Sequence, residues 1–131
     1  MRTLPQLAAL AACVVAGTLA ATRADARLTF HATLLKSSPA QNDTLRAAPK
    51  TISLWFSERV ELSLATVKLT DEKGAAIALA APTLADDEKA PLVVAIPKAP
   101  AAGKYRISWS VAAKDGHASK GTIDFVIRAT R

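Results

Sequence analysis

Short segments in which apolar and polar residues alternate run through most of the chain. In the segment 104–112 every second residue is large and apolar, and mainly polar residues lie between them. The apolar positions are Tyr105, Ile107, Trp109 and Val111. The same alternation runs through 51–57, 65–70 and 122–128. A period of two places every second side chain on one face of a β-strand, so we predict strands in these segments, each with one buried face.

Residues that favour turns separate these segments. The sequence Asp71-Glu72-Lys73-Gly74 predicts a turn, because glycine adopts positive φ without steric cost. Further short strands are predicted within 30–39 and 92–96, the second of them ended by Pro97. The Ala-rich stretch 75–85, which contains Pro82, predicts a strand followed by a loop. No long segment carries the apolar stripe of an amphipathic helix. About seven short strands in a chain of this length predict one all-β domain, an antiparallel β-sandwich similar to an immunoglobulin domain.

Tyr105 follows Gly103 at the start of one predicted strand. A tyrosine in this position resembles the tyrosine corner of β-sandwiches, in which the hydroxyl group bonds to a nearby backbone group. The alternative is a half-buried tyrosine without that bond.

The N-terminal segment has the organisation of a secretory signal peptide. A basic residue precedes an uncharged run from Leu7 to Ala21, and Ala24-Asp25-Ala26 matches the small-x-small cleavage motif. The apolar run is shorter than a membrane-spanning helix requires. Lipidation at Cys13 is the less favoured alternative, because apolar residues continue after it. We therefore predict a signal peptide at 1–26 and an exported domain at 27–131.

Removal of this leader changes the inventory of reactive side chains. The chain has 131 residues with one Cys, one Met and two His, and both sulfur-containing residues lie in the leader. The predicted mature domain therefore forms no internal disulfide, holds no zinc through thiolates and offers no soft sulfur ligand to a cuprous ion. Both histidines, His31 and His117, remain.

The net charge of +6 is spread along the chain. Lys and Arg residues lie among Asp and Glu rather than on one stripe, which is typical of a solvated surface. Proteins that bind nucleic acid usually cluster their positive charge, so we expect no nucleic-acid partner.

The segment Asp115-Gly116-His117 lies between two predicted strands and permits two interpretations. Asp-Gly is a common hairpin-turn signal, and His117 would then be a solvated turn residue. Alternatively, side chains two positions apart in an extended chain point to the same side, so a carboxylate and an imidazole could face one ion. That pair suits Cu(II) in a tetragonal site, and His31 is the only other imidazole in the sequence.

Several blocks of residues, taken in order and with their spacing, resemble the CopC family of periplasmic copper-binding proteins. The blocks are His31-Ala32-x-Leu34-x-Lys36-Ser37-Ser38-Pro39-Ala40, Ala48-Pro49-Lys50, Leu54-x-Phe56-Ser57-Glu58, Ala102-Gly103-x-Tyr105-x-x-x-Trp109 and Ser110-x-x-x-x-Asp115-Gly116-His117. No single block is specific, but the resemblance extends from His31 to Arg128, nearly the whole predicted mature chain.

The resemblance implies a seven-stranded Greek-key β-sandwich that binds one Cu(II) ion at one end. It places the ligands on His31, Asp115 and His117. Glu58 matches a family glutamate near that site, where it would act as a weak ligand or orient one, although a solvated carboxylate at a strand end is equally consistent. The resemblance further implies a monomeric protein that is not an enzyme. Its role would be copper sequestration, resistance or delivery, with an inner-membrane CopD-type protein as a candidate partner.

Two features depart from the family pattern. In many members the signal peptide ends immediately before the first histidine, whose α-amine then joins its imidazole at the metal. Here Phe30 precedes His31, and the better cleavage motif ends at Ala26, so Arg27 is the predicted N-terminus. Some members bind Cu(I) through a Met-rich loop, but the corresponding stretch 64–79 contains no Met. We therefore expect a cupric site without a cuprous one.

Two other functions fit less well. A copper ion held by an N-terminal histidine activates oxygen in oxidative polysaccharide enzymes. That reaction requires His31 at the N-terminus and a sugar-stacking surface, which one Tyr, two Trp and three Phe barely supply. A β-sandwich without metal could serve in adhesion or as a scaffold, since a fold alone does not establish function. Replacing both histidines would then change nothing measurable.

Overall fold

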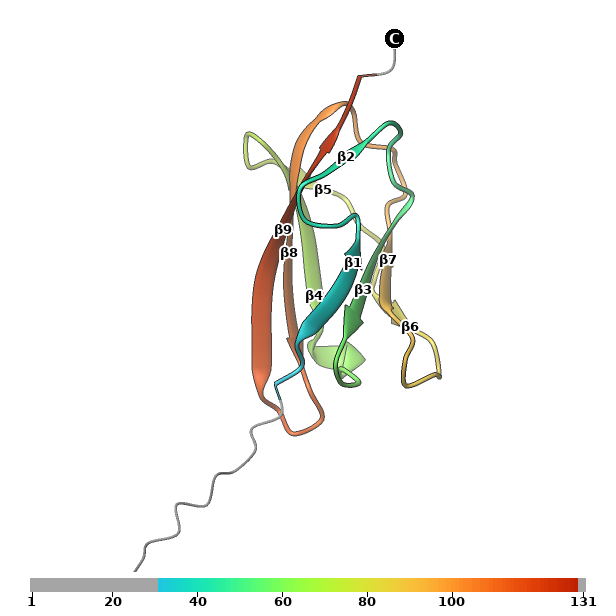
Figure 1. Cartoon of the computed structure of the whole chain (residues 1–131), viewed down its shortest axis with the longest axis vertical. Coiled ribbons are helices and arrows are strands. Elements are labelled where there is room, and N and C mark those ends of the chain that lie inside the picture. Colours follow the sequence, from blue (N-terminus) through green and yellow to red (C-terminus); the bar gives the residue numbers. More distant parts are fainter. Residues whose placement is uncertain (1–30, 130–131) are drawn as a thin grey trace, which may run out of the picture.

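Residues 31–129 form nine β-strands and one short 3-10 turn (Figure 1). This description rests on a computed structural model, and the predicted signal peptide at 1–26 lies outside the described residues. The elements are β1 (Leu34–Ser38), β2 (Asp43–Leu45), β3 (Thr51–Phe56), η1 (Leu62–Leu64), β4 (Thr66–Asp71), β5 (Ala76–Ile77), β6 (Thr83–Leu84), β7 (Leu92–Ala95), β8 (Gly103–Ala112) and β9 (Ala118–Ile127).

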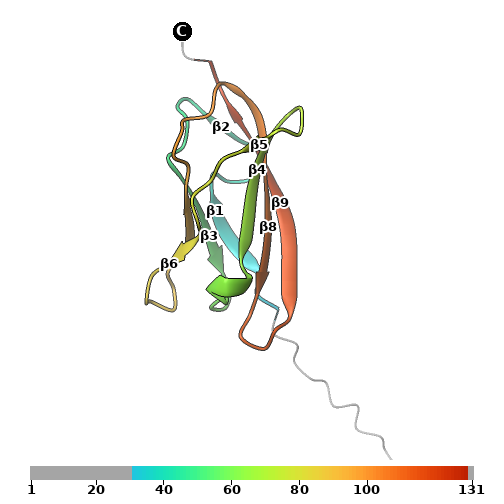
Figure 2. The ribbon, with the colours of Figure 1, turned by 180° about the vertical axis from the view of Figure 1, so that it is seen from behind.

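The strands form two sheets that pack face to face (Figures 1 and 2). One sheet has the order β1-β3-β7-β6 and the other the order β2-β9-β8-β4-β5. Neighbouring strands are antiparallel, except that β2 runs parallel to β9. The predicted all-β sandwich is therefore confirmed. In the described part of the chain, no helix is long and apolar enough to cross a membrane.

The strand count exceeds the predicted seven for local reasons. The Ala-rich stretch 75–85 contains two strands of two residues each, and these belong to different sheets: β5 pairs with β4, and β6 pairs with β7. β2 has only three residues, too few for a period of two to be visible. The predicted strand 122–128 begins earlier, at Ala118, where small and polar residues hide the alternation.

The alternating residues supply the core between the sheets. Every second residue of β8 from Tyr105 to Val111 is buried, and the residues between them are exposed or half-buried. The opposite sheet contributes Ile52, Leu54, Leu92 and Val94, each with 1% exposure or less. Because apolar burial is the dominant favourable term in folding, this pattern determines which face of each strand points inward. In the described residues, polar and charged side chains lie on the outer faces of the sheets and in the loops.

Trp109 and Gly121 form a packed pair across β8 and β9. A Cβ atom at Gly121 would lie 2.6 Å from Cζ2 of Trp109, closer than side-chain atoms approach one another. The indole ring also packs edge-on against Phe56 of the opposite sheet, with ring centroids 5.2 Å apart. Glycine at position 121 therefore leaves the space that this tryptophan occupies.

The tyrosine corner predicted at Tyr105 is confirmed. Its hydroxyl group donates a 2.5 Å hydrogen bond to the carbonyl of Ala101, and its ring stacks on Phe125 with centroids 5.6 Å apart. Burial, followed by the negative charges of Asp71 and Glu72, raises the pKa of Tyr105. The corner ties the start of β8 to the loop before it, so it helps to set where this long strand begins.

Candidate metal centre

The β8–β9 hairpin carries two of the predicted site residues. Ala112 pairs with Ala118, and the residues between them, 113–117, form the loop. Gly116 has a φ of +84°, a conformation that L side chains rarely adopt, and its N–H donates a 2.9 Å bond to the carbonyl of Ala113. The hairpin turn indicated by Asp-Gly in the sequence is confirmed. It places this loop at one end of the sandwich (Figures 1 and 2).

The carboxylate of Asp115 holds the imidazole of His117. Oδ2 accepts a 2.9 Å hydrogen bond from Nδ1 of His117, and Oδ1 accepts a 3.0 Å bond from the backbone N–H of the same residue. The backbone bond, followed by the side-chain bond, lowers the pKa of Asp115, so the carboxylate stays ionised. Because Nδ1 carries the shared proton in neutral imidazole, Nε2 keeps its lone pair for a metal.

His31 lies against His117, although the two residues are far apart in the sequence. Their ring centroids are 5.3 Å apart and the ring planes meet at 78°. The blue start of the described chain lies beside the β8–β9 loop in both views of the fold (Figures 1 and 2). His31 is exposed, whereas its neighbour Ala32 is buried with 1% exposure. The structure thus brings together His31, Asp115 and His117.

Glu58 lies at the same end, in the segment between β3 and η1. It shares a hollow of about 360 Å³ with Arg59, Lys114 and Asp115. Two backbone contacts hold this segment to the hairpin: Val60 bridges Ala113, and the N–H of Glu61 donates a 2.8 Å bond to the carbonyl of Ala112. Glu58 therefore neighbours Asp115, and the cationic side chains of Arg59 and Lys114 lie around the same hollow.

The spacing of the two imidazoles is compatible with one shared ion. Two imidazoles bound to one ion at about 2.0 Å have ring centres roughly 4.5 Å apart for bonds at a right angle and roughly 6.4 Å apart for opposite bonds. The observed 5.3 Å lies between these values. No three His, Cys, Asp or Glu side chains within residues 31–129 are arranged to enclose a metal, and the carboxylate of Asp115 is directed at His117 rather than away from it. The arrangement is therefore an open pair of imidazoles, one of them oriented by a carboxylate.

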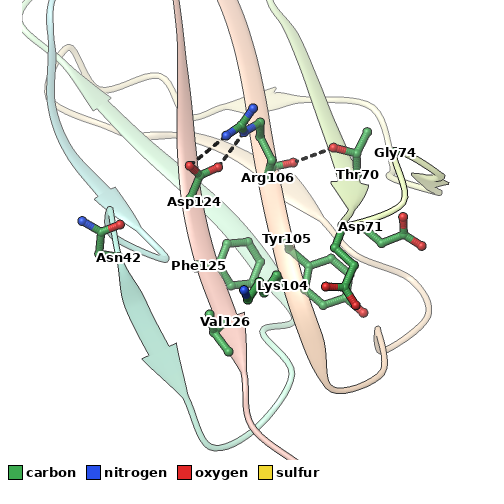
Figure 3. Close-up of a pocket in the computed structure, with 11 residues that line it drawn as sticks. Asn42, Thr70, Asp71, Gly74, Lys104, Tyr105, Arg106, Asp124, Phe125 and Val126 are labelled. Carbon is green, nitrogen blue, oxygen red and sulfur yellow. Dashed lines mark hydrogen bonds and ion pairs between the residues drawn. The ribbon is translucent and has the colours of Figure 1, made fainter.

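A second hollow, of about 540 Å³, lies on the outer face of the five-stranded sheet (Figure 3). Across it Arg106 donates two hydrogen bonds to the carboxylate of Asp124, at 2.6 and 3.0 Å, so the two charges neutralise each other. Arg106 precedes Ala112 by six residues along β8, which corresponds to roughly 20 Å. This hollow is therefore separate from the histidine pair and offers it no ligand.

Sequence analysis assigned no function to two residues near His31. Thr33 and Ser57 bond to each other, and they connect the segment that carries His31 to the end of β3. Ser57 appeared in the sequence only as part of the Phe56-Ser57-Glu58 block. A pairing between residues so far apart in the chain leaves no periodic signal, so no pattern within this sequence would have identified it.

The sequence matches a known family and its relatives. A family model described as the CopC domain matches residues 34–128, which include Glu58, Asp115 and His117. Protein YobA of Escherichia coli (strain K12) is 33% identical over 98 residues, covering 75% of this chain and 79% of that protein. Copper resistance protein C of Xanthomonas campestris pv. juglandis is 34% identical over 115 residues, covering 84% of this chain and 90% of that protein.

Solved structures of similar proteins have the same architecture. CopC from Methylosinus trichosporium OB3b superimposes with a TM-score of 0.69 at 27% identity, covering 74% of this chain and 93% of that chain. PcoC, a methionine-rich copper resistance protein from Escherichia coli, superimposes with a TM-score of 0.65 at 29% identity, covering 76% of this chain and 100% of that chain. The resemblance inferred from short motifs is confirmed by these matches. The chain belongs to the CopC domain family.

Proposed function

We propose that this protein binds one Cu(II) ion between His31 and His117 and serves copper resistance or transport in the periplasm. The observation that carries the proposal is the contact between these imidazoles, whose centroids are 5.3 Å apart. Asp115 adds a negative charge beside them, because a carboxylate is ionised at neutral pH. The bonds from His117 lower the pKa of Asp115 further. An ionised carboxylate next to two imidazoles is a donor set that suits a divalent cation of the Irving–Williams series, copper above all.

The relatives support copper as the cargo. One is named copper resistance protein C, and the two superimposed structures are titled CopC and a copper resistance protein. The family match covers three of the four residues that we assign to the site, and His31 lies three residues before its start.

The donor types favour the cupric state. Cu(I) is held best by thiolate and thioether sulfur. This sequence has one Cys and one Met, both within the predicted signal peptide, whereas PcoC is titled methionine-rich. We therefore assign a Cu(II) site to this chain and no cuprous site.

Each residue of the proposed site has a different role in binding the ion. His117 presents Nε2, because its Nδ1 is bonded to Asp115. Asp115 sets the tautomer and the ring orientation of His117. To serve as a further donor as well, its carboxylate must turn from Nδ1 toward the ion. Glu58, beside Asp115, adds a second negative charge near the ion and acts through that charge or as a weak ligand. Water or the α-amine of the mature chain completes the coordination.

The cellular role follows from the predicted leader and the chemistry. A monomeric protein exported to the periplasm and holding Cu(II) at an exposed site can sequester the ion or pass it on. It needs no catalytic step to do so. The exposure of both histidines suits exchange with a membrane protein of the CopD type.

The deciding experiment is a Cu(II) titration of the secreted chain, followed by EPR and by competition with a chelator. We expect one tetragonal Cu(II) signal per chain with nitrogen hyperfine structure. It should be lost or strongly weakened in His31→Ala and in His117→Ala. Glu72→Gln, which removes a carboxylate at the β4–β5 turn, is the matched control and should bind as the parent does. Absence of a stoichiometric signal near neutral pH in the parent chain would refute the proposal.

A further inference from the structure

We propose that Ser57 is a positioning residue that holds His31 in front of His117 and thereby sets the affinity for copper. The inference rests on the proposed function, since it concerns how one ligand of that site is held. It assigns a role to a side chain whose hydrogen bond is to Thr33.

The contact between Ser57 and Thr33 is reciprocal. The backbone N–H of Ser57 donates a 2.8 Å hydrogen bond to the carbonyl of Thr33, and the Oγ of Ser57 accepts a 2.9 Å bond from the backbone N–H of Thr33. The hydroxyl group of Thr33 in turn lies 3.3 Å from the carbonyl oxygen of His31. Three hydrogen bonds therefore connect the end of β3 to the backbone of His31.

The position of this contact explains why a side chain is needed. The ladder between β1 and β3 reaches its last pair at Leu34 and Phe56, next to an irregularity in the register. Beyond that pair, the N–H of Thr33 finds its acceptor in the hydroxyl group of Ser57 instead of a backbone carbonyl. Ser57 thus extends the ladder by one step, toward the end of the sandwich where His31 lies.

Without the hydroxyl group, only the backbone bond from the Ser57 N–H to the Thr33 carbonyl would pair the chain next to His31. Ala32 is buried, which fixes the position of that residue. Its methyl side chain forms no hydrogen bond, so it does not fix the direction of the backbone at His31. Chain ends beyond the last paired residue open with little free-energy cost. An imidazole on such an end would face His117 for only a fraction of the time. The apparent dissociation constant rises as that fraction falls.

Ser57 accepts the bond from Thr33 through its hydroxyl oxygen. Two substitutions can therefore test the hydroxyl group separately from the backbone. Ser57→Ala removes the acceptor but keeps the backbone N–H that bonds to Thr33. Ser57→Thr keeps the hydroxyl and should restore the contact. The loss of one hydrogen bond of ordinary net strength corresponds to a change of about 3- to 10-fold in an equilibrium constant. We therefore expect Ser57→Ala to raise the Kd for Cu(II) by about 3- to 10-fold.

The test uses the secreted chain and has two readouts. Competition titration with a Cu(II) chelator gives the Kd of the parent chain, Ser57→Ala, Ser57→Thr and the control Ser63→Ala. Ser63 is an exposed serine in η1, outside the Thr33 contact. In the metal-free protein, NMR reports nuclear Overhauser effects between the rings of His31 and His117, together with amide exchange at Thr33. We expect Ser57→Ala to weaken the ring contacts and speed that exchange, while Ser57→Thr and Ser63→Ala match the parent.

The outcomes separate this inference from the proposed function. If the parent binds Cu(II) and Ser57→Ala binds it equally well with unchanged ring contacts, Ser57 has no positioning role and the proposed function stands. If Ser57→Ala weakens binding but Ser57→Thr does so equally, the hydroxyl group is not the cause and the inference fails. A parent chain that binds no Cu(II) would overturn both.

Discussion

The imidazole of His31 meets that of His117 edge-on, with ring centroids 5.3 Å apart and an interplanar angle of 78°. One ring belongs to the segment before β1 and the other to the β8–β9 loop, so two segments far apart in the sequence meet at this end of the sandwich. Asp115 orients the second ring through Nδ1. The following predictions test this arrangement and the fold that supports it.

Replacement of Asp115 by Asn should weaken copper binding without removing either imidazole. Asparagine retains an oxygen acceptor for Nδ1 of His117 but loses the negative charge. Loss of such an orienting partner typically reduces metal affinity by 10- to 100-fold, and we expect about this change in the competition titration. Glu72→Gln removes one carboxylate from the opposite end and should leave the Kd unchanged. An equal effect of both variants would mean that net charge, rather than the Asp115–His117 bond, governs affinity.

The position of the mature N-terminus should alter the number of nitrogen ligands. Intact-mass analysis of the secreted protein is expected to give a chain that begins at Arg27. A chain engineered to begin at His31 would present its α-amine beside its own imidazole, and a chelate of that kind should bind Cu(II) more tightly. EPR should then show an additional nitrogen. Equal affinities and identical spectra for the two chains would show that the amine is not a ligand.

Gly121→Ala should destabilise the fold through Trp109. The new Cβ would lie 2.6 Å from the indole ring, so the ring or the strand must shift. Overpacking of this kind usually costs about 1–3 kcal/mol, and we expect a loss of that size in the free energy of unfolding. Denaturant unfolding monitored by tryptophan fluorescence measures it. Thr122→Ala, an exposed position on the same strand, serves as the control and should change the unfolding free energy by much less.

We expect the ionisation of Tyr105 to lower the stability of the fold at alkaline pH. Its pKa is raised in the folded protein, mainly by burial, so the folded state holds the phenolic proton more tightly than the unfolded state does. The stabilisation is complete below the ordinary tyrosine pKa of about 10 and is lost as the pH rises from there through the folded pKa. The free energy of unfolding should therefore fall above pH of about 10.

Tyr105→Phe separates this titration from general alkaline effects. The variant should be less stable at neutral pH, because the hydrogen bond to Ala101 is gone. Its stability should nevertheless depend less steeply on pH above 10 than that of the parent. Parallel pH curves for the two proteins would show that Tyr105 does not contribute to the alkaline loss.

Features that depend on near neighbours along the chain could be predicted from the amino-acid sequence. The alternation in 104–112 identified β8 and its buried face, because the pleat of a strand repeats every two residues. The Asp-Gly pair located the β8–β9 turn, since Gly116 takes a positive φ there. Tyr105 after Gly103 indicated the tyrosine corner. In each case the physical cause lies within a few residues along the chain, so a single sequence is enough to predict the feature.

Contacts between distant residues depend on how the chain folds. The proximity of His31 to His117 was expected only from the family resemblance, because no local pattern connects two residues so far apart in the sequence. The division of 75–85 between two sheets depends on which edge each short strand reaches, and β2 is too short to show a period. The pairing of Ser57 with Thr33 and the bond from His117 to the carboxylate of Asp115 likewise require the folded chain. Long-range pairing and the direction of side chains in loops are set by packing in the folded protein. That packing cannot be read from a single sequence.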